Sequence, residues 1–288
     1  MREIRRVAVL GAGTMGHGIA HACATSGYRV AMYDVDREAN RRGVERIRQT
    51  LDKGVELGKV TDAQRHEALN RIMVTTDLQA AVSEADLVIE AAPESLELKA
   101  RIFSQVAGSA PPDALLATNT SSLSVAKIAE SVGDPGRFVG LHFFNPVHAM
   151  KLVEVVWGPG TSDATREAAV AFARSLGKEP VVVRDSPGFA SSRLGIVLGM
   201  EAIRMVEEGV AAPEDIDRAM ELGYRHPMGP LRLTDLVGLD VRLGIAEYLH
   251  ETLGSEAFRP PDLLRHMVAE GKLGKKSGQG FYDWSEPS

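Results

Sequence analysis

The sequence predicts an α/β fold in which a doubly wound, mainly parallel sheet is followed by an all-helical domain. Three observations lead to this prediction. Short apolar runs alternate with helical patterns from residue 7 to about residue 118, which is typical of a parallel sheet covered on both faces. The first run turns through closely spaced glycines into a helix. Strand signals end near Asp185, so we expect one domain of residues 1–184 and another of residues 185–288.

The composition indicates a globular protein whose partners are small molecules or other protein chains. A chain of 288 residues is long enough for two domains, each with its own core. The formal net charge of −6 gives no electrostatic reason to expect nucleic-acid binding, and no apolar run is long enough to span a membrane. Cys23 is the single cysteine, and no signal peptide pattern precedes the first strand. We therefore expect a cytoplasmic protein without a disulfide framework or a metal site.

Residues 7–16, VAVLGAGTMG, predict a buried strand that passes through a phosphate-binding turn into a helix. Gly11 allows the tight turn, Gly13 lets the backbone approach a pyrophosphate, and Gly16 lets the helix pack closely on the strand. A second apolar run ends at Asp34, at the distance of about 20 residues where a carboxylate meets the ribose 2′-hydroxyl of NAD. Asp34 repels a 2′-phosphate and the next two residues supply no arginine, so the pattern favours NAD over NADP in a Rossmann-type fold.

The segment of residues 37–71 predicts a helical arm on the nucleotide-binding domain. Its first helix runs from residue 37 to about residue 58, and its second begins at the good N-cap Thr61. The first helix also has a basic side, made of Arg41, Arg42, Arg46, Arg48 and Lys53. This side is either an ordinary solvated face or a contact for a phosphorylated part of the substrate, and the sequence leaves both open.

Three further strands are predicted, over residues 72–76, 86–92 and 114–118. A polar loop, residues 119–122, follows the last of them, at the end of a parallel strand where ligands bind in open α/β sheets. Asn119 and Ser121 in this loop are candidate ligand contacts. Alternatively, the loop caps the helix that starts near Ser124.

Two apolar strands are predicted over residues 137–146 and 151–156, and each contains one ionisable residue among bulky apolar neighbours. These residues are His142 and Glu154. An unpartnered buried charge is costly, so we expect the two side chains to pair. A carboxylate that accepts from one imidazole nitrogen fixes the tautomer and leaves the other nitrogen to act as a base. The alternative is a buried structural contact.

Four motifs together resemble the single-function L-3-hydroxyacyl-CoA dehydrogenases, including the 3-hydroxybutyryl-CoA dehydrogenases. They are GAGTMG at 11–16, NTSSLS at 119–124, GLHFFNP at 140–146 and KLVEV at 151–155. The resemblance covers essentially the whole chain and continues through DSPGF at 185–189, EDID at 214–217, HPMGP at 226–230 and GKKSGQGFY at 274–282. It implies NAD-dependent interconversion of a short-chain L-3-hydroxyacyl-CoA and the 3-ketoacyl-CoA, as in fatty acid β-oxidation. It also implies a homodimer formed through the helical domain.

The resemblance further implies roles for individual residues. His142 is the catalytic base, Glu154 its orienting partner and Ser121 a hydrogen-bond partner of the substrate oxygen. Together with the glycine turn and Asp34, the positions that match the lining of the cofactor or active site are Thr14, Met15, Ala91, Glu94, Lys99, Asn119 and Asn145. The expected substrate contacts are Ser121, Asn119 and Lys53.

One catalytic position departs from the family pattern, because Ser192 stands where the family usually has asparagine before Arg-Leu. A serine is shorter and has one hydroxyl donor, so it reaches the substrate carbonyl through water or not at all. Ser192 therefore keeps a second hypothesis open, an NAD-dependent dehydrogenase of a small free hydroxy acid or sugar acid. A third hypothesis is a non-catalytic NAD-binding protein.

After Asp185 the sequence predicts four helices, over residues 187–208, 213–222, 231–253 and 260–270. The first of them is apolar on several sides. This pattern indicates burial against another surface.

Overall fold

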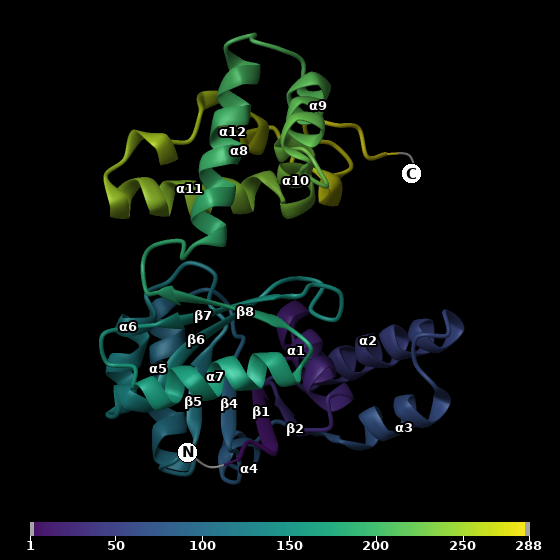
Figure 1. The fold of residues 1–288 in the computed structure, drawn as a ribbon, viewed down its shortest axis with the longest axis vertical. Coiled ribbons are helices and arrows are strands. Elements are labelled where there is room, and N and C mark those ends of the chain that lie inside the picture. Colours follow the sequence, from purple (N-terminus) through teal and green to yellow (C-terminus); the bar gives the residue numbers. More distant parts are fainter. Residues whose placement is uncertain (1–2, 286–288) are drawn as a thin grey trace. The chain divides into compact units, whose positions relative to one another are not determined.

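The computed structural model of the protein describes residues 3–285 and divides into two compact units, Met1–Ser186 and Pro187–Ser288. The first unit contains the whole sheet, and the second contains helices only within its described residues (Figure 1). No helix in the described part of the chain is long and apolar enough to cross a membrane.

The first unit is built on an eight-stranded sheet with the order β3-β2-β1-β4-β5-β6-β7-β8. Neighbouring strands from β3 to β6 are parallel, β6 and β7 are antiparallel, and β7 and β8 are parallel again. This confirms the mainly parallel sheet that the sequence predicts. The strands are Arg6–Leu10 (β1), Arg29–Tyr33 (β2), Ile72–Thr75 (β3), Leu87–Glu90 (β4), Leu115–Thr118 (β5), Phe138–Phe143 (β6), Leu152–Trp157 (β7) and Glu179–Arg184 (β8).

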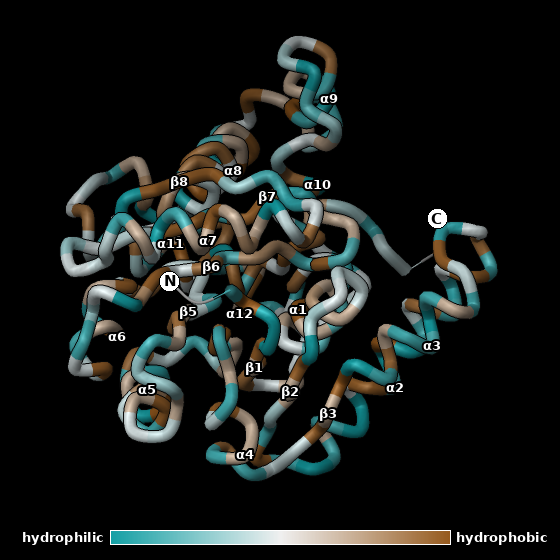
Figure 2. The backbone as a smooth tube through the Cα atoms, turned by 60° about the horizontal axis from the view of Figure 1, so that its bottom comes forward, coloured by the Kyte–Doolittle hydropathy of each residue, from teal (hydrophilic) through white to brown (hydrophobic). Residues whose placement is uncertain are grey.

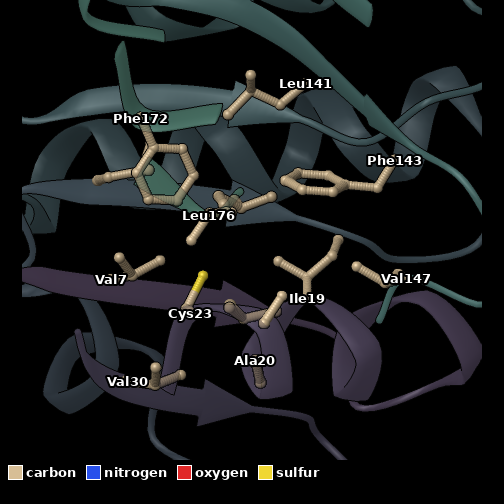
Figure 3. Close-up of a cluster of buried hydrophobic side chains, with 14 of the residues drawn as sticks. Val7, Ile19, Ala20, Cys23, Val30, Leu141, Phe143, Val147, Phe172 and Leu176 are labelled. Carbon is tan, nitrogen blue, oxygen red and sulfur yellow. The ribbon is translucent and has the colours of Figure 1, made fainter. Parts of the chain in front are cut away.

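Helices cover both faces of this sheet. As a result, strands β1, β4, β5 and β6 are buried almost throughout. On one face, Cys23 of α1 and Phe172 of α7 pack in one cluster with Val7 and Phe143 of the sheet (Figure 3). On α5, Phe103 meets Phe138 of β6 edge to face, with ring centroids 4.7 Å apart. The longer helices of the unit are Thr14–Thr25 (α1), Arg37–Glu56 (α2), Asp62–Asn70 (α3), Leu96–Ser109 (α5) and Asp163–Ser175 (α7), and the short ones are Leu78–Val82 (α4) and Val125–Ala129 (α6).

The predicted helical arm is present as α2 and α3, which extend away from the sheet edge (Figure 2). The Thr61 hydroxyl accepts from the Gln64 amide, and the Gln64 side chain accepts from the Thr61 amide, so α3 starts with a complete capping box. Ile47 and Leu51 are among the few residues that α2 buries, and most of this helix is exposed.

Neither α7 nor β8 is among the elements predicted from the sequence. The β8 strand is a sheet edge, and its side chains lack the alternation of buried and exposed positions that marks a strand. Val181 and Val182 are 44% and 48% exposed, and Pro180 lies beside them. A proline at an edge costs no ladder hydrogen bond, so the strand forms despite its weak pattern.

The second unit consists of helices α8 to α12 and short 3₁₀ turns. One prediction was wrong, because the helix expected over residues 231–253 is broken in two. Gly238 has φ +104°, a conformation that side-chain-bearing residues rarely adopt, and it separates α10 from α11. The helices are Ser191–Glu207 (α8), Pro213–Tyr224 (α9), Pro230–Val237 (α10), Leu239–Leu253 (α11) and Asp262–Ala269 (α12).

Two buried carboxylates of this unit hold the C-terminal segment of the chain. Asp235 accepts hydrogen bonds from the amides of Phe281 and Tyr282 and from the Trp284 indole, at 2.8–2.9 Å. Asp217 accepts from the Tyr282 hydroxyl at 2.7 Å. A Cβ at Gly280 would lie 2.2 Å from the Asp235 carboxylate, so this position has room for glycine only. The motif at 274–282 therefore has a structural explanation.

Candidate active site

The glycine turn connects β1 to α1, and its three glycines have three different environments. Gly11 has φ +104°, and a Cβ there would lie 2.7 Å from the Ala91 carbonyl oxygen. A Cβ at Gly16 would lie 1.7 Å from the Gly11 carbonyl oxygen, so the helix packs on the turn with no room for a side chain. A Cβ at Gly13 would meet no atom within 4 Å. The backbone at Gly13 is therefore open to a ligand, as a pyrophosphate site requires.

Asp34 follows β2 and lies against this turn. One of its carboxylate oxygens accepts from the Ala12 amide at 2.8 Å, and the other accepts from the Asp36 amide at 3.0 Å. Helix α1 begins directly after Gly13 and has no acidic residue in its first turn. Its N-terminal amides and dipole thus favour an anion, and the carboxylate stands beside them for a ribose hydroxyl. These features fit NAD, although Thr14 and Met15 have no contact here that identifies a ligand.

His142 and Glu154 are directly opposite each other in the antiparallel pair β6 and β7. The distance from His142 Nδ1 to Glu154 Oε2 is 2.8 Å, and the residues are 7% and 1% exposed. A carboxylate only accepts, so Nδ1 carries the proton in the neutral ring, which leaves Nε2 unprotonated. The strand register thus brings the two predicted residues together in the geometry of an oriented base.

A second carboxylate organises the polar loop after β5. Glu94 Oε1 accepts from the Thr120 hydroxyl at 2.5 Å, from the Ser121 amide at 2.9 Å and from the Ser121 hydroxyl at 3.2 Å. The Ser122 amide donates to the same oxygen at 3.2 Å. Glu94 therefore fixes the conformation of the loop that carries Ser121.

The pKa of Glu94 follows from these contacts. Partial burial would raise the pKa, but the Lys99 ammonium and the hydrogen bonds from Thr120 and Ser121 outweigh it. The pKa of Glu94 consequently lies below its ordinary value, and the carboxylate is ionised at neutral pH. An ionised Glu94 is the form that accepts every hydrogen bond of the loop.

Beneath this loop lies an ion pair that the sequence analysis missed. Lys99 Nζ is 2.7 Å from Glu90 Oε1, and both side chains are almost fully buried. The Glu90 carboxylate also accepts from the Ala92 amide and the Thr118 hydroxyl. The sequence pattern that could have predicted this pair is a charged residue, Glu90, at the end of an apolar strand, followed nine residues later by a lysine. Lys99 thus supports the loop from inside the unit.

The remaining predicted residues of the first unit lie around the same edge of the sheet. Asn119 accepts from the Phe143 amide at 2.8 Å and ties the end of β5 to the end of β6. The Ala91 amide donates to the Leu10 carbonyl at 2.7 Å in the loop after β4. Asn145 is exposed and lies just after β6. Ser192 belongs to the second unit, on the first turn of α8.

The basic side of α2 lines a cavity of about 460 Å³, which we call the basic cavity. Lys53 lies on its wall and is paired with Glu56 at 2.9 Å. The lining also includes the loop between β6 and β7 and one residue of α1. The residues that line the basic cavity are His17, Arg46, Gln49, Thr50, Lys53, Gly54, Leu57, Lys59 and His148.

Comparisons with known proteins agree with this architecture. The family model of the 3-hydroxyacyl-CoA dehydrogenase NAD-binding domain matches residues 6–186, and that of the C-terminal domain of the same family matches residues 188–284. A probable 3-hydroxybutyryl-CoA dehydrogenase of Bacillus subtilis is 47% identical over 284 residues, 99% of each chain. A 3-hydroxybutyryl-CoA dehydrogenase of Bradyrhizobium diazoefficiens is 42% identical over 98% of this chain and 96% of its own.

Among solved structures, the (S)-3-hydroxybutyryl-CoA dehydrogenase from Ralstonia eutropha superimposes with a TM-score of 0.95. It is 43% identical and is covered over 100% of its length by 99% of this chain. These matches confirm the resemblance that four short motifs had indicated. The chain belongs to the 3-hydroxyacyl-CoA dehydrogenase family and is an NAD-dependent dehydrogenase built from the NAD-binding and C-terminal domains of that family.

Proposed function

We propose that this protein interconverts a short-chain L-3-hydroxyacyl-CoA, such as 3-hydroxybutyryl-CoA, and its 3-ketoacyl-CoA, with His142 and Glu154 as its acid-base pair. The observation that supports this most strongly is the buried contact of 2.8 Å between the two side chains, in a unit that also contains the glycine turn. NAD supplies the hydride acceptor in the oxidative direction.

His142 removes the proton of the 3-hydroxyl group as the hydride leaves the third carbon. Its Nε2 is the nitrogen that accepts this proton, because Nδ1–H is committed to Glu154. The imidazolium that forms is stabilised by the adjacent carboxylate, which is almost completely buried and therefore poorly screened by water. In the reductive direction the same imidazolium returns the proton to the keto oxygen.

Ser121 holds the substrate oxygen in this proposal. Its loop is fixed by Glu94, which is itself supported by Lys99 from below. Such a chain of fixed groups pre-orients the reacting oxygen, and orientation contributes as much to the rate as the proton transfer does. Asn119 supports the same arrangement by fastening β5 to β6.

The basic cavity is the proposed site for the phosphate groups of coenzyme A. Arg46 and Lys59 have no ion-pair partner in the described part of the chain, whereas Lys53 is shared with Glu56. Cationic side chains without a local partner favour phosphate oxygens. Arg46 and Lys59 are therefore the proposed primary phosphate contacts, and Lys53, which lines the same cavity, is proposed as a substrate contact beside them.

A single assay tests the proposed reaction. NADH oxidation is followed by absorbance with acetoacetyl-CoA and with free acetoacetate, and the assay is repeated with NADPH. We expect oxidation with the thioester and NADH together. Activity with the free acid and none with the thioester would transfer the assignment to a hydroxy-acid dehydrogenase. No turnover with either would contradict a catalytic role.

We also propose that the second unit forms a homodimer. Its helices leave large apolar side chains exposed, with Leu194 at 68%, Leu222 at 74% and Tyr224 at 76%. Covering these side chains with a second chain would remove apolar surface from water, which favours association. Light scattering of the wild type and of Leu222→Glu tests this, with a dimer expected for the former and dissociation for the latter. A wild-type monomer would contradict the proposal.

The cytoplasm is the proposed location, because Cys23 is the single cysteine and lies fully buried without a disulfide. Labelling of cell fractions with an antibody would test this location. Recovery in an exported fraction would contradict it.

A further inference from the structure

The basic cavity contains two histidines that the catalytic scheme does not use. His17 lies on α1, four residues after the nucleotide turn, and His148 lies in the loop between β6 and β7. They line the same cavity as Arg46, Lys53 and Lys59. The cavity thus combines three cationic side chains with two imidazoles.

His17 is held in one tautomer. Its Nδ1 lies 2.6 Å from the Gly13 carbonyl oxygen. A carbonyl oxygen only accepts, so Nδ1 carries the proton and the neutral ring has an unprotonated Nε2. Within residues 3–285, Nε2 has no hydrogen-bond partner. A neutral His17 therefore offers a lone pair to the cavity, and it becomes a donor to an anion only when protonated.

The surroundings of His17 keep it neutral before a ligand binds. Burial lowers the pKa of His17 most, and Arg46 and His148 lower it further, while the Gly13 hydrogen bond raises it in part. His21 faces it from the same helix, and Lys53 and Lys59 line the cavity from α2 and the segment after it. The Lys53 ammonium is paired with the carboxylate of Glu56, the last residue of α2.

An anion in the cavity reverses this balance. A phosphate group adds negative charge where the existing groups are basic, so it favours the protonated form of the half-buried histidine. Protonation then supplies an N–H donor at Nε2, and this charge-assisted hydrogen bond is stronger than a neutral one. Ligand binding and protonation must therefore favour each other by the same factor.

We propose that His17 takes up a proton from solvent when the phosphate groups of an acyl-CoA occupy the basic cavity, so that substrate affinity is linked to pH through this residue. His148 lines the same cavity and is more exposed than His17. The inference rests on the proposed function, because it takes the ligand of the cavity to be coenzyme A. It adds a residue that sets substrate affinity without taking part in the chemical step.

The test is calorimetric titration of the complete protein with butyryl-CoA, which has no oxygen on its third carbon and cannot turn over. Titrations at pH 7.5 in two buffers of different ionisation enthalpy give the number of protons taken up. At this pH the phosphate, whose second pKa is about 6, is already almost fully ionised and contributes little. We expect a measurable fraction of a proton per bound ligand in the wild type.

His17→Asn is the matching variant, because an asparagine amide can still donate to Gly13 while its side chain no longer titrates. We expect the proton uptake to fall and the affinity to become less dependent on pH. In the wild type, the dissociation constant should rise by up to about tenfold per pH unit between the free and bound pKa values. His66→Gln is the control, since His66 is exposed on α3 and does not line the cavity. It should leave the uptake unchanged.

The outcomes separate this inference from the proposed function. Tight binding without proton uptake in the wild type, or uptake that His17→Asn leaves unchanged, overturns the inference and leaves the dehydrogenase proposal intact. Absence of butyryl-CoA binding, together with no oxidation of NADH by acetoacetyl-CoA, overturns both. The wild-type titration needs no variant, so a misfolded His17→Asn protein would still leave the inference testable.

Discussion

The two units each bury a carboxylate, but the hydrogen-bond partners of the two carboxylates differ. In the first unit, Glu154 contacts the imidazole of His142, a group that can accept and release a proton. In the second unit, Asp235 accepts from two amides and an indole, none of which titrates near neutral pH. The difference teaches that burial alone does not mark a catalytic carboxylate. A partner that exchanges a proton indicates chemistry, whereas fixed neutral donors indicate a structural role.

The largest expected effect comes from removing the titrating partner. His142→Ala should lower kcat by about 10²–10⁴-fold, the usual contribution of general acid-base catalysis, because no imidazole remains to accept the proton. Binding of NADH should change little, since the nucleotide turn lies on other elements. Steady-state kinetics and fluorescence titration with NADH measure the two quantities. Loss of both together would mean that His142 is structural and would break the comparison.

Asp235→Ala should act on stability instead. Three partly buried donors would lose their acceptor, and an unpaired donor costs about 1–3 kcal/mol when buried, so we expect the free energy of unfolding to fall by about 3 kcal/mol. Urea unfolding followed by the fluorescence of Trp284, in a Trp157→Phe background, reports the second unit. Asp283→Ala is the control, because that carboxylate is exposed and bonds only to Ser285 nearby. An unchanged unfolding midpoint for Asp235→Ala would contradict the structural role.

His21 is a buried histidine, and none of the groups that shift its pKa is a carboxylate. It therefore contrasts with His142, which contacts Glu154. Burial, with help from His148, His17 and Lys178, lowers the pKa of His21 from 6.5 to about 4. The unfolded chain therefore binds a proton between pH 6.5 and 4 that the folded chain does not, so stability falls as pH falls through this window. The loss amounts to about 3 kcal/mol.

Unfolding experiments at several pH values measure this effect. His21→Asn should remove most of the extra loss of stability between pH 6.5 and 4, even where the variant is less stable at pH 7.5. An unchanged slope would show that His21 is charged in the folded protein.

The smallest effect is expected at Ser192. Ser192→Asn restores an amide donor where the family usually has one, and a hydrogen bond of about 1 kcal/mol corresponds to roughly a fivefold rise in kcat/KM for acetoacetyl-CoA. The steady-state assay with the wild type as reference measures it. No gain, or a gain with free acetoacetate alone, would contradict a role for this position in binding the thioester.

The sequence predicted those features that depend on local pattern. The glycine turn, the helical arm and its Thr61 cap follow from residue types at fixed spacing. The contact of His142 with Glu154 was predictable because each is an isolated ionisable residue in an apolar strand. Pairing the two side chains avoids the free-energy cost of burying either one without a partner.

Other features depend on contacts distant in the sequence. Edge strand β8 has no alternation to reveal it, and the break at Gly238 depends on its positive φ. The inward direction of the Lys99 side chain depends on its pairing with the Glu90 carboxylate at the end of β4, and its place in the lining of the cofactor or active site stays a prediction. The clamp formed by Asp235 joins residues 46 to 49 positions apart, which no local pattern encodes.

One paired measurement tests the central comparison most directly. The kcat per folded protein and the free energy of unfolding are measured for Glu154→Gln and for Asp235→Asn, each of which removes a buried charge and keeps the shape of the side chain. We predict that Glu154→Gln loses about 10²-fold or more in kcat and keeps most of its stability, whereas Asp235→Asn loses stability and keeps its kcat. Equal losses of both quantities in the two variants would contradict the account.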